Sequence, residues 1–211
     1  MVVITIIAML AAMLLPSLSN AKARAGRMEC LNDIRQLNFA LRMYADDNED
    51  EYPPRAEREF SWIYTLEPYY NDAKVLRCPS DHASTNHSYI LNGFNDWFEA
   101  NLTPSDYALY KDWRWPRGMK SDGASQPSDT VTFGEKRKNS IHVHMDFFQG
   151  LGNDIEEIDH GKHNDGAARV GGANFGFMDG GVRFLKYWQS LTPENLWAVT
   201  PAYRQQAIPE P

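Results

Sequence analysis

Residues 1–15 read MVVITIIAMLAAMLL, and Pro16 follows them. No residue from Met1 to Ala21 is charged. A bilayer-spanning helix needs about 20 apolar residues, so the run up to Pro16 is short, and counting on through Ala21 brings it to marginal length. We therefore predict a membrane-embedded helical segment over residues 1–21.

Two other interpretations of this segment remain open. It resembles a signal peptide, with Ala21-Lys22-Ala23 as a weak cleavage site, although no basic stretch precedes the apolar residues. It also fits a buried helix of a soluble protein, but a helix that is apolar on every side needs a large apolar partner surface. The polar remainder of the chain does not indicate one.

After Pro16 the pattern changes to that of an amphipathic helix. Apolar residues recur at helical spacing, and basic residues lie between them. The apolar positions are Leu31, Ile34, Leu37, Leu41 and Tyr44. The acidic run over residues 46–51 and the prolines Pro53 and Pro54 end the pattern. We predict one long helix, with an amphipathic second part over residues 22–50 that ends near Asp47.

The remaining residues, 51–211, predict one globular domain. The whole chain of 211 residues is 43% hydrophobic and 12% aromatic, which is typical of a folded protein. Its net charge of -7 gives no general attraction to phosphate backbones, so we expect no nucleic-acid partner. We predict a helix over residues 62–70, strands over 88–91 and 130–133, and leave the aromatic-rich stretch 101–115 undecided.

The clearest local signal is a hairpin over residues 174–185, NFGFMDGGVRFL. With Asp179 and Gly180 as the two central residues of a type I′ turn, Phe177 faces Val182 and Phe175 faces Phe184. That register places the apolar residues of both strands on one face.

Together these segments resemble type IV pilin-like proteins, specifically the pseudopilin-like group of Planctomycetes and Verrucomicrobia with a prepilin methylation segment and a C-terminal H-x9-DG motif. The N-terminal run resembles the end of the methylation segment. VLRCPSD (75–81) resembles a second-cysteine loop, SYILNGF (88–94) a central strand, and GGANFGFMDGGVRFL (171–185) the terminal hairpin.

The resemblance implies an α+β fold in which a long N-terminal helix packs on a mainly antiparallel sheet. It implies a non-catalytic structural subunit of a type II secretion or type IV pilus-like filament. The implied partners are copies of the chain and other pilin-like subunits, contacted through the N-terminal helix, together with the inner membrane and a prepilin peptidase. The globular domain would be periplasmic or part of an extracytoplasmic filament. The alternative is a membrane-tethered extracytoplasmic binding module that does not polymerise.

Two features depart from the family pattern. A basic leader, a cleavage-site glycine and a Phe-Thr-Leu-Ile-Glu type start do not precede Val2, so we expect that the beginning is missing or was set late. His163 and Asp179 are separated by 15 residues rather than nine, and an insertion over residues 165–170 accounts for the difference.

The family location outside the cytoplasm permits Cys30 and Cys78 to form a disulfide, and two buried free thiols are the alternative. The resemblance also singles out His163, Asp179 and Glu135. Carboxylates would suit calcium, whereas His163 would favour a transition metal. We favour no metal: His163 fastens a loop to the hairpin, Asp179 forms the turn, and Gly180 supplies its positive φ.

The string His142-Val143-His144-Met145-Asp146 resembles part of a metallo-β-lactamase motif, although Phe147 replaces its last histidine. Two histidines one residue apart on a strand point to the same side, where they are able to share a metal. A metal-dependent hydrolase is therefore a third and weaker hypothesis. An ordinary polar strand face is the favoured interpretation of this string.

Overall fold

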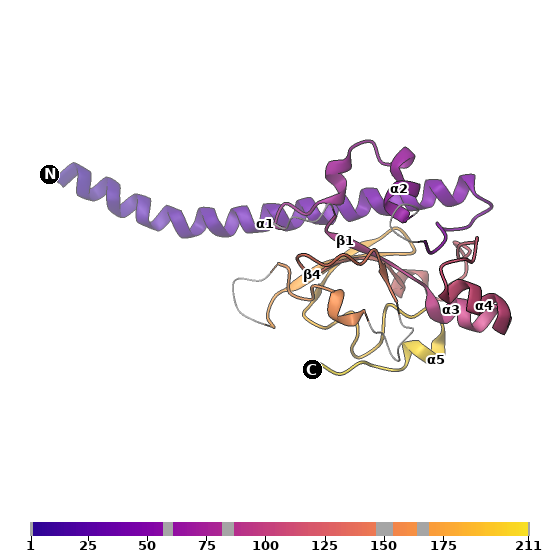
Figure 1. Cartoon of the computed structure of the whole chain (residues 1–211). Helices are drawn as coiled ribbons and strands as arrows, with labels where there is room; N and C mark the ends of the chain where they lie inside the picture. The colour runs from indigo at the N-terminus through magenta and orange to yellow at the C-terminus, as the bar shows by residue number, and fades with distance from the viewer. Residues whose placement is uncertain (1, 57–60, 82–86, 147–153, 164–168, 211) are drawn as a thin grey trace.

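The computed structural model describes residues 2–56, 61–81, 87–146, 154–163 and 169–210. Its largest element is α1 (Val2–Asp47), one helix of 46 residues that continues through Pro16. At about 1.5 Å per residue it is about 69 Å long. Figure 1 shows that its first half extends away from the rest of the protein, while its second half lies along the sheet. The predicted α+β fold is confirmed.

The second half of α1 is helical because its apolar face is covered. Ile34, Leu37 and Leu41 of the predicted stripe are buried, and Leu31 and Tyr44 are partly buried. The helix ends where predicted, because Glu49 and Asp50 adopt positive φ angles of 56° and 61°. The Asp50 amide then donates to the Ala45 carbonyl and closes the helix end.

A five-stranded sheet carries the globular part, in the order β3-β1-β2-β4-β5. The strands are β1 (Tyr89–Asn92), β2 (Val131–Glu135), β3 (His144–Met145), β4 (Gly172–Phe177) and β5 (Val182–Lys186). All neighbouring pairs are antiparallel except β1 and β3, which are parallel. The two strands predicted over residues 88–91 and 130–133 correspond to β1 and β2.

Strands β1 to β4 are buried on both faces, whereas β5 is buried only at Leu185. Tyr89, Leu91 and Phe133 belong to the core that includes α1. Ile90 and Phe175 belong to a second core, which the C-terminal segment covers. The register of β2 against β4 shifts between Val131 and Gly134, so a bulge directs consecutive residues of β2 toward α1.

The predicted register of the terminal hairpin is wrong by one residue. Gly176 pairs with Val182, and Phe175 pairs with Arg183. The Gly180 amide donates to the Phe177 carbonyl, and Gly180 has a φ of +85°, as in a three-residue loop that ends in a left-handed glycine. The apolar residues do not share one face because both faces of the sheet are packed.

Short helices complete the domain. They are α2 (Trp62–Thr65), α3 (Asn95–Asn101), α4 (Pro104–Lys111) and α5 (Pro201–Arg204), with 3-10 turns at Glu67–Tyr69, Ala73–Leu76, Pro127–Asp129 and Ile155–Glu157. The helix predicted over residues 62–70 is thus α2 and the first of these turns. The undecided stretch 101–115 holds α4, where the Thr103 hydroxyl accepts a hydrogen bond from the Asp106 amide.

Among the residues that the structure describes, no helix is both long enough and apolar enough to cross a membrane. The expectation of a transmembrane segment over residues 1–21 is not confirmed by this finding.

Candidate functional site

The first half of α1 exposes a continuous apolar surface. Its large aliphatic side chains are between 53% and 72% exposed, whichever side of the helix they occupy. They are Val3, Ile4, Ile6, Ile7, Met9, Leu10, Met13, Leu14, Leu15 and Leu18. Monomeric soluble proteins rarely expose an apolar patch of this extent, which is typical of an interaction surface. We call residues 3–18 the apolar arm; Pro16 lies within it.

Contact between α1 and the domain begins near Gly26. A Cβ atom added to Gly26 would lie 3.0 Å from the Ser80 Oγ atom. Further along, the Asn38 side chain donates to the Phe177 carbonyl at 3.3 Å and accepts from the Thr132 hydroxyl at 2.6 Å. The second half of α1 is therefore fixed to β2 and to the terminal hairpin, whereas the described side chains of the apolar arm are exposed.

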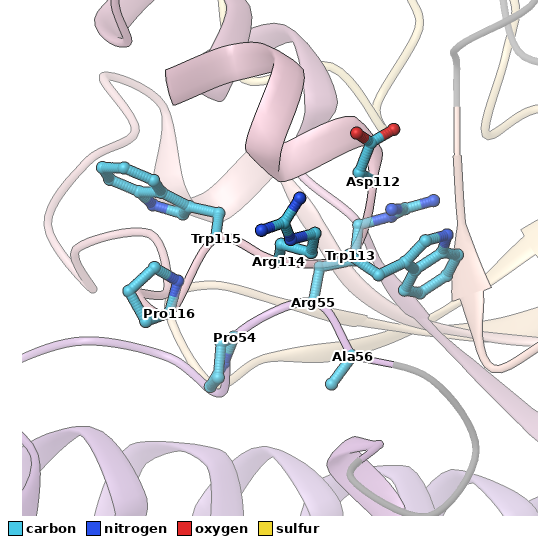
Figure 2. A pocket seen from close by; sticks show the side chains of 8 residues that line it. All are labelled: Pro54, Arg55, Ala56, Asp112, Trp113, Arg114, Trp115 and Pro116. Carbon is cyan, nitrogen blue, oxygen red and sulfur yellow. The ribbon is translucent and has the colours of Figure 1, made fainter. Parts of the chain in front are cut away.

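A cavity of about 440 Å³ lies beside the end of α4, between two segments that are distant in sequence. Figure 2 shows its lining, which comes from residues 54–56 and 112–116 and includes Trp113 and Trp115. The Arg55 guanidinium lies 3.2 Å from the centre of the Trp113 ring. In the sequence, the signal for this cavity is the string Trp113-Arg114-Trp115-Pro116, which by itself indicates only an aromatic-rich stretch.

Arg55 is also the binding partner of Asp146, the aspartate of the His142–Asp146 string. Its guanidinium donates to both carboxylate oxygens of Asp146 at 2.9 Å, and the Asn95 amide donates to the same carboxylate. Both side chains of the ion pair are buried. Asp146 thus holds the segment after α1 against the sheet.

The two histidines of this string do not share a site. The strand comprises only His144–Met145, so His142 precedes it. The His142 side chain is 42% exposed and lies 3.3 Å from an Asp154 oxygen, whereas His144 is buried against Trp113. Burial lowers the pKa of His144 to about 4. These different surroundings do not support the hypothesis of a metal shared by His142 and His144, and Phe147 lies outside the described residues.

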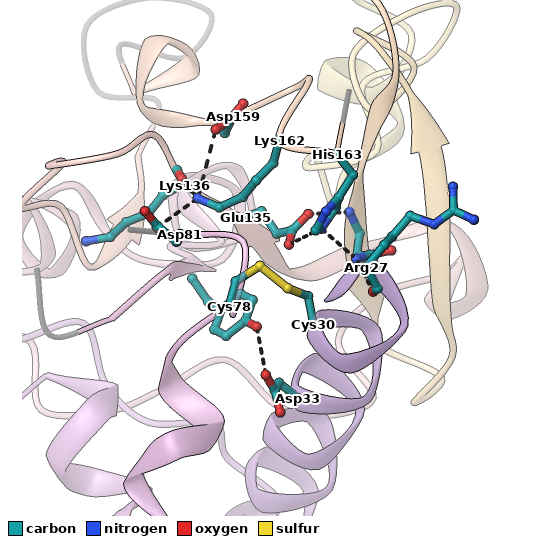
Figure 3. Close-up of a disulfide and its surroundings, with 12 residues drawn as sticks. Arg27, Cys30, Asp33, Cys78, Asp81, Glu135, Lys136, Asp159, Lys162 and His163 are labelled. Atoms are coloured by element: carbon teal, nitrogen blue, oxygen red, sulfur yellow. Dashed lines mark hydrogen bonds and ion pairs between the residues drawn. A yellow bond between two sulfur atoms is a disulfide. The ribbon is translucent and has the colours of Figure 1, made fainter. Parts of the chain in front are cut away.

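A disulfide joins α1 to the loop after the 3-10 turn Ala73–Leu76. Cys30 and Cys78 form this bond across a sequence separation of 48 residues, and both are buried. Figure 3 shows that the bond lies beside Glu135 and His163. The disulfide pairing that the family resemblance implied is present.

Glu135 and His163 lie together beside this disulfide. The His163 Nε2 atom is 2.9 Å from the Glu135 Oε1 atom, and both side chains are buried. The Asn174 backbone amide donates to the Glu135 Oε2 atom at 2.7 Å, and the His163 amide donates to the Gly172 carbonyl at 3.0 Å. His163 therefore connects the loop before β4 to β2.

Asp179, the third residue that the resemblance singled out, is not part of this cluster. Its carboxylate accepts from the Gly181 amide at 2.7 Å within the hairpin loop. Most of the predicted insertion over residues 165–170 lies outside the described residues, which include only Arg169 and Val170 of it. Among the described residues, the donor atoms of Cys30, Cys78, Glu135 and His163 form a group whose members all lie within 4.8 Å of one another.

Two lysines with buried side chains, Lys162 and Lys136, lie next to the cluster of Glu135 and His163. Lys162 donates to Asp81 at 2.9 Å and to the Lys136 carbonyl at 2.7 Å. Burial, together with the charge of Lys162, lowers the pKa of Lys136 to about 8. The Lys136 ammonium lies 2.7 Å from the His87 Nε2 atom, and burial and this charge lower the pKa of His87 to about 4.

On α1, Asp33 faces the sheet near the disulfide and accepts from the Tyr89 hydroxyl at 3.2 Å. Burial raises the pKa of Asp33 to about 7, and the hydrogen bond from Tyr89 opposes that rise. Asp33 is therefore a buried acid whose charge changes near neutral pH.

Comparison with known proteins gives one similarity that bears on this arrangement. No family model and no solved structure matches the chain. The chain is 32% identical over 99 residues to the type II secretion system core protein G of Pectobacterium carotovorum subsp. carotovorum. The matched part is 44% of this chain and 63% of that protein, so the chain spans less than two thirds of its relative. The chain is thus similar in part to a type II secretion core protein, and its own structure has the α+β, pilin-like arrangement described above.

Proposed function

We propose that the chain is a structural, pilin-like subunit of a type II secretion or type IV pilus-like filament. The observation that carries this proposal is the apolar arm, which extends from a domain that is otherwise packed on both faces of its sheet. The similarity to a type II secretion core protein supports the same conclusion. The proposed role is mechanical, and we assign no catalytic residue.

The exposed surface continues beyond the arm. Met28, Phe39 and Met43 are 54%, 60% and 50% exposed on the half of α1 that contacts the domain. With about 100° per residue, these three side chains lie within about 60° of one another around the helix axis. Val3, Ile7, Leu10 and Leu14 fall close to the same line. Exposed apolar side chains on this line therefore occur in both halves of the helix, with the exposed Asn32 between Met28 and Phe39, and they are placed to pack against parallel helices of other copies.

The finer parts of the proposal concern the arm and its division from the domain. We propose residues 1–21 as the filament-core segment, 22–50 as the linking amphipathic helix and 51–211 as the globular domain. We also propose that the arm associates with the inner membrane before assembly, that the domain lies in the periplasm, and that a prepilin peptidase processes a leader. Burial of apolar surface contributes about 25 cal/mol of free energy per Å², and it drives the arm out of water both in the membrane and in the filament core.

Photo-crosslinking tests the assembly. A benzophenone amino acid at Leu14 is expected to capture residues of the arm from a second copy, as mass spectrometry of the linked peptides would show. The matched control is the same amino acid at Ile141, which is 62% exposed but lies on the domain. Equal capture from the two positions, or no capture between copies, would contradict the proposal.

A second candidate function is a membrane-tethered binding module that does not polymerise. The observation that favours it is the cavity lined by Trp113 and Trp115. Aromatic and apolar walls with a few polar groups are typical of ligand sites. In the crosslinking experiment, capture between copies would support the filament subunit, and no capture between copies would support the binding module.

A further inference from the structure

The Cys30–Cys78 disulfide shares its surroundings with two buried side chains that are themselves metal ligands in many proteins. Two sulfur atoms, one imidazole nitrogen and one carboxylate oxygen lie within 4.8 Å of one another. We propose that reduction of this disulfide creates a zinc site formed by Cys30, Cys78, His163 and Glu135, and that oxidation expels the metal. This inference does not depend on the filament proposal.

The donor atoms lie close enough together to reach the spacing of a tetrahedral site after small side-chain movements. With zinc bonds of about 2.3 Å to sulfur and about 2.0–2.1 Å to nitrogen or oxygen, donor atoms in such a site lie about 3.3–3.8 Å apart. His163 Nε2 and Glu135 Oε1 lie 2.9 Å apart and would separate by about 0.4 Å to reach this range. Once the S–S bond is broken, the two sulfur atoms are free to separate by side-chain rotation alone.

The neighbouring residues hold the ligands in position. The Glu135 Oε2 atom is occupied by the Asn174 amide at 2.7 Å, which leaves Oε1 on the side of His163. The backbone of His163 is bonded to Gly172 of β4. Cys30 is fixed by α1, and Glu135 belongs to β2. The four ligands therefore come from separate parts of the fold that the domain itself brings together.

The donor set selects the class of metal. Two thiolates and an imidazole are soft or borderline ligands, which suit zinc rather than calcium. Calcium takes six to eight oxygen ligands, and Asp179, the additional carboxylate that the sequence suggested, lies in the hairpin loop instead. The proposed site thus uses Glu135 and His163 without Asp179.

The switch is balanced as a two-electron exchange. A dithiol or phosphine reductant gives two electrons, and with two protons the S–S bond becomes two thiols. Zinc binding then displaces both thiol protons, and His163 binds through its neutral Nε2 atom. In the reverse direction a disulfide oxidant accepts two electrons from the thiolates, the S–S bond forms again, and zinc leaves because its sulfur ligands are lost.

Cobalt spectroscopy on the full chain in detergent tests the proposal, because tetrahedral Co²⁺ thiolate sites absorb visible and near-ultraviolet light. After reduction with a phosphine and removal of trace metal, one equivalent of Co²⁺ is expected to produce thiolate-to-cobalt absorption, which Zn²⁺ abolishes. The oxidised chain is expected to show none. Folding is followed in parallel by circular dichroism.

Variants test the two ligands that are not cysteines. His163→Gln and Glu135→Gln are each expected to weaken Co²⁺ binding by at least about tenfold. His142→Gln changes a partly exposed histidine outside this donor group, so it is the matched control and is expected to have no effect. Absence of cobalt absorption in the reduced chain, folded or unfolded, would overturn the proposal. Unchanged affinity in both ligand variants would also overturn it, since two free thiols alone would then bind the metal.

Discussion

Gly176 of β4 and Ile34 of α1 are so close together that a side chain at position 176 would force its neighbours to move. A Cβ atom added to Gly176 would lie 2.8 Å from the Ile34 Cγ2 atom and 2.7 Å from the Asn38 Nδ2 atom. Real Cβ atoms essentially never approach other atoms this closely. The missing side chain is what lets the second half of α1 lie directly on the sheet.

Gly176→Ala is therefore expected to destabilise the domain by about 1–3 kcal/mol, the usual cost of overpacking. Urea unfolding followed by circular dichroism measures the change. Gly180→Ala separates this effect from backbone strain, because nothing lies within 4 Å of an added Cβ there while φ is +85°. Gly180→Ala should cost about 1 kcal/mol, and Gly180→Asn should cost less because asparagine tolerates this conformation. A neutral Gly176→Ala would show that α1 does not pack on β4 as described.

The disulfide is expected to contribute about 4 kcal/mol, the loop-entropy value for a closed loop of 48 residues. The double variant Cys30→Ser/Cys78→Ser should show this loss in unfolding experiments with EDTA present, and reduction of the original chain should produce a similar loss. Protein from an oxidising compartment should contain no thiol that reacts with an alkylating reagent. Two alkylated cysteines in the native chain would contradict the pairing.

Asp33 is expected to give the domain a distinctive pH dependence. Its pKa of about 7 in the folded state lies above the ordinary value of 3.8, so the folded state binds the proton more tightly. The stabilisation that the protonated Asp33 carboxyl gives to the folded state is fully present below pH 4, and it is lost as the pH rises to about 7. Asp33→Asn lacks this loss, so its stability relative to the original chain should rise by about 2–4 kcal/mol between pH 4 and pH 8.

Tyr89→Phe provides the control for this prediction. The Tyr89 hydroxyl lowers the pKa of Asp33, so its removal should extend the loss of stability to higher pH. A difference between Asp33→Asn and the original chain that stays constant with pH would show that Asp33 is ionised in the folded state throughout.

Breaking the Arg55–Asp146 pair is expected to be costly because both side chains are buried. Asp146→Ala should destabilise the domain by about 3–5 kcal/mol, since it leaves the guanidinium without its carboxylate. The exposed pair Arg42–Asp46 offers the comparison, and Asp46→Ala should change stability by less than about 1 kcal/mol. Thermal unfolding of the two variants measures both values. Similar losses would contradict the structural role of Asp146.

The sequence predicted those features that depend on local pattern. The spacing of Ile34, Leu37 and Leu41 and the acidic run near Asp47 are sufficient to place the second half of α1 and its end. The hairpin register could not be predicted, because the alternation rule assumes one buried face and this sheet has two. Its Phe175 and Phe184 therefore point to opposite sides.

The site was predictable only in part for a related reason. Glu135 and His163 were singled out by family resemblance, but their contact with the disulfide depends on how α1, β2 and the loop before β4 come together. The pairing of Arg55 with Trp113 joins segments more than fifty residues apart. Such tertiary contacts leave no periodic signal in the chain, so the cavity beside α4 and the buried partner of Asp146 became visible only in the structure.

Sedimentation velocity of the full chain and of a chain lacking residues 1–25 tests the central claim most directly. In buffer without detergent, the full chain is expected to self-associate through the apolar arm. The shortened chain is expected to sediment as a monomer, to retain the Cys30–Cys78 bond and to unfold cooperatively, because contact with the domain begins at Gly26. A shortened chain that has lost its cooperative transition, or that associates as strongly as the full chain, would contradict the account.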